Sequence, residues 1–251
     1  DLHSFPTRRS SDLVGVDYDQ FRSLIEWQIE EGIDAIIACG TSGEASTLTD
    51  EEHLNTVKFV VDTVHGRVPV IGGAGSNDTR HGIHLAQKME ETGVDALLLV
   101  TPYYNKCSQQ GLIRHYTATA DAVHVPCILY SVKGRTGVNI APETAEALSK
   151  HPNIVGIKEA SGDIAQVAEI CRRVPEDFAV YSGNDDSVVP LLSLGGIGYI
   201  SVLANVVPKD AVEMSRAFLD GNVARARELQ LAMKPLIDAD QIGRASCRER
   251  V

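Results

Sequence analysis

Short apolar runs alternate with amphipathic stretches along residues 16–238 of the chain. The runs contain few polar residues, which is typical of parallel strands that are covered on both faces. We expect seven strands, at Ala35–Gly40, Val68–Gly72, Ala96–Thr101, Cys127–Val132, Ile154–Ala160, Phe178–Gly183 and Tyr199–Leu203. The repeat of strand, loop and helix therefore predicts an α/β fold.

The stretches between the strands carry apolar residues at helical spacing on one face. In one of them Leu54, Val57 and Val61 share a stripe, and Thr49 stands before it as a favourable N-cap. The same pattern predicts helices over residues 18–31, 50–65, 78–92, 109–124, 142–151, 163–174, 187–194, 208–220 and 223–238.

No G-x-G-x-x-G motif follows the first strand, which disfavours a Rossmann fold. A (β/α)8 TIM barrel suits the 251 residues, since such barrels run to about 250 residues. We expect this barrel to be truncated, with the first strand and the C-terminal helices missing. The barrel domain is assigned to residues 14–241. Residues 1–13 and 242–251 are rich in Ser and Arg without a period, so we interpret them as non-native-looking terminal segments.

Composition narrows the classes of partner. The net charge is −11, and an acidic surface repels phosphate backbones, so we expect no nucleic-acid partner. No apolar stretch reaches the roughly 20 residues that a membrane helix needs, so no membrane association is expected. The five cysteines are scattered and form no C-x-x-C pair. This usage favours a reducing cytoplasm over a disulfide scaffold or a zinc site.

Lys158 carries the clearest chemical signal in the sequence. It lies at the C-terminal end of the apolar run IVGIKEA, and catalytic groups of barrels stand at such strand ends. A lysine buried in a strand is either paired or has a lowered pKa, and a neutral amine can attack a ketone to form a Schiff base. The alternative is a buried salt bridge, but Glu159 is a poor partner because neighbouring strand residues point to opposite faces.

Hydroxyl groups follow other strand ends. Thr41 and Ser42 lie in the loop GTSGE, which could hold a substrate carboxylate or could be a simple turn. Tyr130 ends one strand, and Tyr104 follows another. A phenol can relay protons, although packing is the commoner role of a tyrosine. Arg135 lies just past a strand, where it could hold a carboxylate in two hydrogen bonds or lie solvated in the loop.

Two other groups suggest metal binding only superficially. His81 and His84 are three residues apart on a predicted helix, but no third ligand stands at a convincing spacing. The acidic pair Asp185 and Asp186 is explained more simply by N-capping of the following helix. We therefore expect no metal site.

The stretches GTSGEASTLTDEEH, VTPYYN, ILYSVKGRTG, GIKEASG and YSGNDD occur in this order over the span Val16–Asp238. On these motifs the chain resembles the 4-hydroxy-tetrahydrodipicolinate synthase (dihydrodipicolinate synthase) family of pyruvate-dependent class I aldolase-like barrels. The resemblance implies a lyase of lysine and diaminopimelate biosynthesis. It would condense pyruvate, held as a lysine imine and then an enamine, with L-aspartate 4-semialdehyde, without a metal or an organic cofactor.

The resemblance also implies a role for individual residues. Lys158 would form the imine, and Tyr130, Ser42 and a Tyr104 that crosses a dimer interface would relay protons. Thr41 and Ser42 would hold the pyruvate carboxylate. The other substrate-binding positions would be Arg135, for the semialdehyde carboxylate, and Gly183 and Ile200, through their backbones. The resemblance further implies a cytoplasmic homotetramer, assembled as a dimer of dimers.

The chain departs from the family pattern at two places near the site. Ser42 stands where threonine is usual, which keeps the hydroxyl. Lys133 replaces a usual proline, which predicts a looser loop around Arg135. Two alternatives stay open: a sister enzyme, either an N-acetylneuraminate lyase or a 2-keto-3-deoxy-sugar-acid aldolase, and an inactive truncated barrel fragment.

Overall fold

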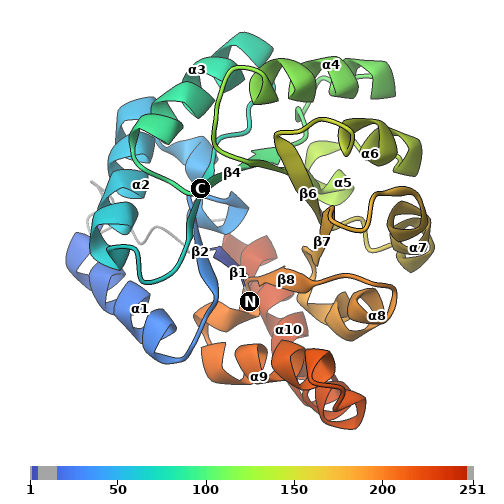
Figure 1. The fold of residues 1–251 in the computed structure, drawn as a ribbon. Coiled ribbons are helices and arrows are strands. Elements are labelled where there is room, and N and C mark those ends of the chain that lie inside the picture. The colour runs from blue at the N-terminus through green and yellow to red at the C-terminus, as the bar shows by residue number, and fades with distance from the viewer. Residues whose placement is uncertain (1, 5–15, 248–251) are drawn as a thin grey trace.

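The computed structural model describes residues 2–4 and 16–247 of the chain. Within them, parallel strands close into a barrel in sequence order, β1 to β8, and helices surround it (Figure 1). The strands are β1 Leu2–Ser4, β2 Ala35–Ala38, β3 Val70–Gly73, β4 Ala96–Val100, β5 Cys127–Ser131, β6 Ile154–Glu159, β7 Ala179–Ser182 and β8 Gly198–Ser201. The predicted (β/α)8 architecture and all seven predicted strands are confirmed.

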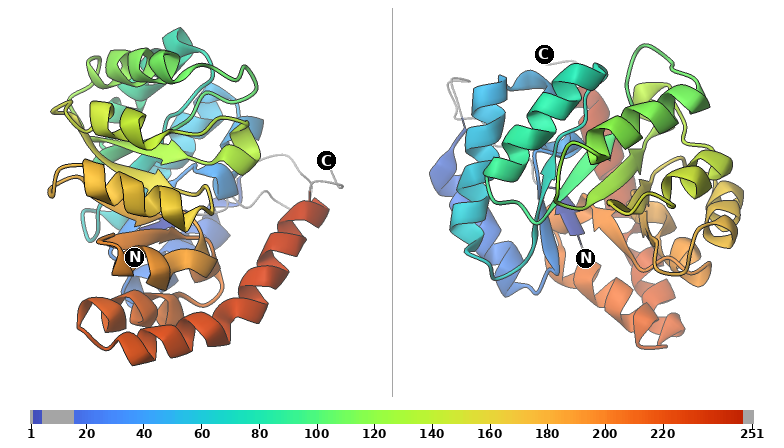
Figure 2. Two further views of the ribbon diagram at one scale, coloured as in Figure 1. Left: turned by 90° about the vertical axis from the view of Figure 1, so that its right-hand side faces the viewer. Right: turned by 45° about the horizontal axis from the view of Figure 1, so that its top comes forward.

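The helices cover the outside of the barrel, as the two views of Figure 2 show. They are α1 Tyr18–Glu30, α2 Asp50–Val64, α3 Thr79–Glu91, α4 Gln109–Ala120, α5 Lys133–Thr136, α6 Pro142–Leu148, α7 Ile164–Arg173, α8 Val188–Ser193, α9 Pro208–Leu219 and α10 Val223–Cys247. Every predicted helix is present, and only the short α5 was not predicted. None of the helices in the described residues combines the length and apolarity needed to cross a membrane.

Alternation along each strand divides the core into two layers. On β2, Ile37 points into the barrel interior, where it clusters with Ile71 and Leu98 of the next two strands. Its neighbour Ile36 belongs to the larger cluster between the strands and the helices. Because both faces are buried, the strands read in the sequence as continuous apolar runs.

The helix starts follow the local signals. The hydroxyl of Thr49 accepts a hydrogen bond from the Glu52 N–H at 3.2 Å, and the Glu52 carboxylate accepts one from the Thr49 N–H at 2.9 Å. This reciprocal capping box begins α2 where the sequence placed its N-cap. Pro142 and Pro208 occupy the first turns of α6 and α9.

The expectation that the first strand is missing is wrong. Leu2–Ser4 form β1, which pairs with β2 on one side, where Leu2 is opposite Ala35, and with β8 on the other, where Leu2 is opposite Ile200. Three residues are too few to show a periodic pattern, so this strand could not be recognised. The unpaired N–H and C=O groups at the edges of β2 and β8 supply the interaction that orders it. The rest of the first terminal segment, residues 1 and 5–13, lies outside the described residues.

Helix α10 is longer than predicted. Ala226, Leu229, Met233 and Ile237 are buried at helical spacing, and this apolar repeat is what the sequence pattern detected. The helical backbone continues beyond Ile237 to Cys247, into the second terminal segment. Pro235 lies inside the helix, and Figure 2 shows α10 bending along its length.

Candidate active site

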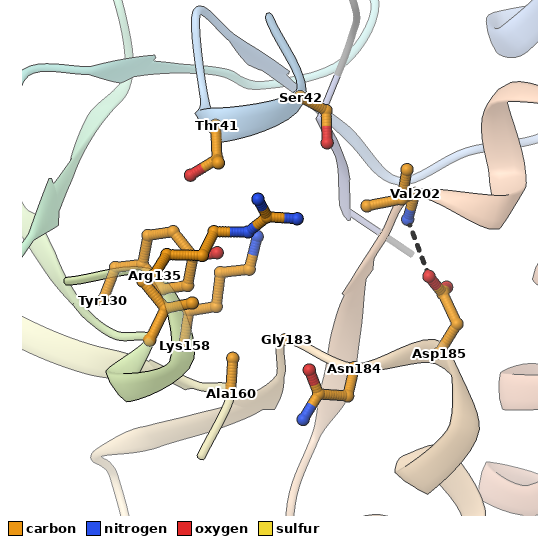
Figure 3. Close-up of a pocket in the computed structure, with 11 residues that line it drawn as sticks. Thr41, Ser42, Tyr130, Arg135, Lys158, Ala160, Gly183, Asn184, Asp185 and Val202 are labelled. Carbon is orange, nitrogen blue, oxygen red and sulfur yellow. Dashed lines mark hydrogen bonds between the residues drawn. The ribbon is translucent and has the colours of Figure 1, made fainter. Parts of the chain in front are cut away.

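A cavity of about 70 Å³ lies at the carboxyl ends of the strands. All the predicted site residues except Tyr104 and Ile200 line it, and Figure 3 shows side chains from distant parts of the chain converging there. The lining residues are Thr41, Ser42, Tyr130, Val132, Arg135, Lys158, Ala160, Gly183, Asn184, Asp185 and Val202. The end of the barrel that the fold predicts for catalysis is therefore the end that carries a cavity.

Lys158 projects from β6 toward this cavity and is only 3 % exposed. Its register partner on β5 is Tyr130, which is 6 % exposed. The Lys158 Nζ lies 4.3 Å from the centroid of the Tyr130 ring. The lysine predicted to carry the chemistry is therefore buried, inside the barrel and in contact with the tyrosine predicted to assist it.

Gly183, at the end of β7, makes the room that the lysine side chain occupies. A Cβ at this position would lie 3.1 Å from both Cγ and Cε of Lys158 and 2.7 Å from the Cβ of Ala160. The 2.7 Å separation is shorter than real Cβ contacts allow, and Lys158 and Ala160 are both buried. Glycine is therefore required sterically at this point, independently of any role of its backbone.

Glu159 points away from Lys158, as strand alternation predicted. Its carboxylate accepts hydrogen bonds from the Ser161 N–H at 3.1 and 3.2 Å and from the Gln166 amide at 2.9 Å, on the outer side of the barrel. Burial raises the pKa of the Glu159 carboxyl above its ordinary value. Glu159 thus has partners of its own on the opposite face of the strand.

Thr41 and Ser42 lie in a single 3₁₀ turn, Thr41–Gly43, that follows β2. Cys39 enters this turn with a left-handed φ of 55°. The Gly43 N–H donates to the Gly40 carbonyl at 3.0 Å and the Glu44 N–H to the Thr41 carbonyl at 3.2 Å. These two N–H groups serve the turn itself, and Figure 3 shows the side chains of Thr41 and Ser42 beside the cavity, where their hydroxyls could meet a ligand.

Arg135 lies on α5, and Figure 3 shows its guanidinium extending over the cavity toward Lys158. Although Lys133 replaces the family's proline, this segment is a regular turn. The Arg135 N–H donates to the Val132 carbonyl at 3.0 Å, and the Gly137 N–H donates to the Lys133 carbonyl at 2.9 Å. The Arg135 guanidinium and the Lys158 amine thus face one small cavity, and the charge of the guanidinium suits an anionic ligand.

Two predicted residues do not line the cavity. The Tyr104 side chain is 87 % exposed, in the loop after β4, with a left-handed φ of 75°. Ile200 is fully buried on β8 and belongs to the apolar cluster of the barrel interior, which also contains Tyr130. Exposure of a large aromatic ring on a strained backbone is unusual, and such strain clusters at functional positions.

Asp185 is a lining residue whose role the sequence analysis misjudged. Its buried carboxylate accepts hydrogen bonds from the Ser201 hydroxyl at 2.5 Å, the Val202 N–H at 3.1 Å and the Leu203 N–H at 3.3 Å. It therefore caps the turn after β8, whereas the sequence suggested capping of the helix that follows Asp185. Its position at the end of β7 was the one available signal. In the described part of the chain, His, Cys, Asp and Glu side chains form no group of three or more that could hold a metal ion.

Known proteins resemble this chain in sequence and in fold. The sequence profile of the Dihydrodipicolinate synthetase family matches residues 13–244. A 4-hydroxy-tetrahydrodipicolinate synthase of Acetivibrio thermocellus is 55% identical over 225 residues, which cover 90% of this chain and 76% of that protein.

Two solved structures superpose on the fold. The 4-hydroxy-tetrahydrodipicolinate synthase of Methylacidiphilum fumariolicum SolV matches 96% of this chain and 80% of its own, with 38% identity and a TM-score of 0.93. The chloride-inhibited dihydrodipicolinate synthase of Acinetobacter baumannii complexed with pyruvate matches 95% of this chain and 81% of its own, with 42% identity and a TM-score of 0.92. With a matching profile over most of its length and relatives more than half identical, the chain belongs to the Dihydrodipicolinate synthetase family.

Proposed function

We propose that the chain catalyses the reaction of a 4-hydroxy-tetrahydrodipicolinate synthase, a lyase that condenses pyruvate with L-aspartate 4-semialdehyde in lysine and diaminopimelate biosynthesis. One observation carries the proposal: a buried lysine amine, Lys158, lies against Tyr130 in a cavity that Arg135 also enters. Relatives more than half identical bear this activity in their names, and the Acinetobacter relative has been solved with pyruvate.

Imine formation begins at the Lys158 Nζ. The neutral form of this amine is the nucleophile, and it attacks the keto carbon of pyruvate. Loss of water gives an iminium ion, which withdraws electrons from the neighbouring methyl group. A methyl proton then leaves and the bound pyruvate becomes an enamine. We assign this proton transfer to the phenol of Tyr130, with the Ser42 hydroxyl and Tyr104 of the partner subunit completing the relay.

The two substrate carboxylates need separate partners. The hydroxyls of Thr41 and Ser42 hold the pyruvate carboxylate, and the Arg135 guanidinium holds the semialdehyde carboxylate in two hydrogen bonds. The enamine carbon attacks the aldehyde carbon, and the aldehyde oxygen takes up a proton. The amino group of the semialdehyde then displaces Lys158 from the former keto carbon, which closes the ring and frees the enzyme. The only water released is the one lost in imine formation.

The proposal requires no metal and no organic cofactor, since the imine itself is the electron sink. The proposal also includes a homotetramer built as a dimer of dimers. Tyr104 is largely exposed and does not line the cavity described above, which supports its proposed role across a subunit interface. The widely spaced cysteines, free in the described residues, support a cytoplasmic location.

A substrate panel tests the proposal against the sister enzymes. The chain is incubated with three substrate sets, and the products are identified by mass spectrometry. The sets are pyruvate together with aspartate semialdehyde, N-acetylneuraminate alone, and a 2-keto-3-deoxy-sugar acid alone. We expect turnover of the first pair alone. Cleavage of either sugar acid at a higher kcat/KM would favour a sister enzyme. Absence of turnover in a chain with a cooperative thermal transition would favour the inactive barrel.

A further inference from the structure

We infer that Thr101 and Thr136 form a positioning pair that fixes the positions of Arg135 and Tyr104 relative to each other. The inference rests on the proposed function, because it assigns the pair to the steps after imine formation, which are the proton relay and the reaction with the second substrate. Thr101 directly follows β4 and is fully buried, and Thr136 directly follows Arg135 and is 6 % exposed. The Thr101 Oγ1 donates to the Thr136 Oγ1 at 2.9 Å, across 35 residues of sequence.

The Thr136 hydroxyl makes as many hydrogen bonds as it can. Besides the one from Thr101, it accepts one from the Val138 N–H at 3.2 Å. Its own proton faces two carbonyl oxygens, that of Val132 at 3.1 Å and that of Val138 at 3.0 Å. The Thr136 hydroxyl thus connects Val132, just before α5, to Val138, just after it. These contacts lie on the buried side of the short helix that carries Arg135, and they hold that helix in place.

The backbone of Thr136 holds the other loop. Its carbonyl accepts a hydrogen bond from the Tyr104 N–H at 3.3 Å, and Tyr104 has the left-handed φ of 75°. Next to it, the side chain of Lys106 lies beside Gly137, with Cε 3.9 Å from where a glycine Cβ would be. A strained backbone of this kind persists only when neighbouring structure holds it. The hydrogen bond to the Thr136 carbonyl is one such contact for Tyr104.

Together these contacts link the two residues that the proposed mechanism uses for the second substrate and the relay. Lys158 lies on β6, and the hydrogen bonds described for the two hydroxyls lie on other segments, so we expect imine formation with pyruvate to be less sensitive to these hydroxyls than the later steps are. Loss of the Thr136 hydroxyl is therefore expected to separate the two half-reactions: pyruvate capture persists, while condensation with the semialdehyde slows.

The experiment compares four variants with the wild type. Thr136→Val removes the hydroxyl at nearly constant shape, and Thr136→Ser keeps it. Thr101→Val removes the donor, and a Thr101→Val/Thr136→Val double variant tests whether the two act as a unit. Thr119→Val is the matched control, because Thr119 is also buried and its hydroxyl donates to the His115 carbonyl within the same helix, α4.

We expect kcat/KM for the semialdehyde to fall about tenfold or more in Thr136→Val, since small displacements of positioned groups have effects of this size. Thr136→Ser and Thr119→Val should stay near wild type, and the double variant should be no worse than Thr136→Val. Borohydride trapping of pyruvate should be unchanged throughout. If Thr136→Val does not fold, Thr101→Val carries the same comparison from the other side of the hydrogen bond.

If the wild type traps pyruvate, any of three results would overturn this inference and leave the proposed function standing. The first is an unchanged kcat/KM in both single valine variants, and the second is additive losses in the double variant. The third is a loss in Thr136→Ser as large as that in Thr136→Val. A wild-type chain that folds but traps no pyruvate overturns the proposed function, and the inference with it.

Discussion

The amine of Lys158 and the ring of Tyr130 are register partners on β6 and β5, with the Nζ 4.3 Å from the ring centroid. A cation above an aromatic face is stabilised by the ring electrons. An iminium ion formed on this nitrogen would keep its positive charge near that face. Tyr130 can therefore serve the proposed reaction in two ways, through its ring for the charged intermediate and through its hydroxyl for proton transfer.

These two roles can be separated by removing the hydroxyl alone. Tyr130→Phe keeps the ring, so we expect pyruvate to be captured while kcat falls about 100-fold or more, as loss of a positioned acid–base group does. Steady-state kinetics and borohydride trapping on the same preparation measure both effects. Tyr130→Ala removes the ring as well and should also slow trapping. A wild-type kcat in Tyr130→Phe would exclude the phenol from the relay.

Gly183 should be intolerant of a side chain. A Cβ would press on Lys158 and Ala160, so Gly183→Ala should displace the lysine and reduce the rate of pyruvate trapping about tenfold or more. Gly82→Ala on α3 is the matched control, because its Cβ would meet its nearest neighbour at an ordinary 3.5 Å. Equal trapping rates in the two variants would show that Lys158 does not depend on the space at Gly183.

Arg135 should affect the second substrate alone. Lysine keeps the charge but cannot form two parallel hydrogen bonds with a carboxylate, so Arg135→Lys should raise the KM for the semialdehyde about tenfold. Because Arg135 is exposed, the thermal midpoint should not change. Pyruvate trapping should also be unaffected. An increase confined to the KM for pyruvate would instead place Arg135 at the first substrate's carboxylate.

Glu159 should make folding stability depend on pH. Burial raises the pKa of its carboxyl above 4.5 in the folded chain, so the folded state favours the protonated form. Its contribution to stability is then complete below about pH 4.5 and is lost as the pH rises through the folded-state pKa. Glu159→Gln resembles the protonated form, so its thermal midpoint relative to wild type should increase with pH. A difference that shrinks as the pH rises would contradict this sign.

Most of the fold was predictable because burial leaves a periodic trace in the sequence. Strands such as β6, apolar on both faces, read as continuous runs, and the position of Lys158 at the end of one identified it as a candidate. β1 left no such trace, since Leu2–Ser4 depend on pairing with two distant strands.

The parts of the site that escaped prediction depend on contacts between distant segments. The Asp185 carboxylate caps a turn after β8, and Thr101 bonds to Thr136 from a different strand end. Neither contact follows from propensity or spacing, because each requires the closed barrel to bring two loops together. Arg135 and Tyr130 were identified because strand ends and motif resemblance fix them locally.

The most direct test of the account is borohydride reduction in the presence of pyruvate, followed by peptide mapping. We predict a stable adduct on Lys158, and none in Lys158→Ala or in Lys158→Met, which fills the space left by the amine with an apolar chain. Circular dichroism shows whether these variants keep the fold. An adduct on another lysine, or one that persists in the folded Lys158 variants, would contradict the claim that this buried amine captures the keto acid.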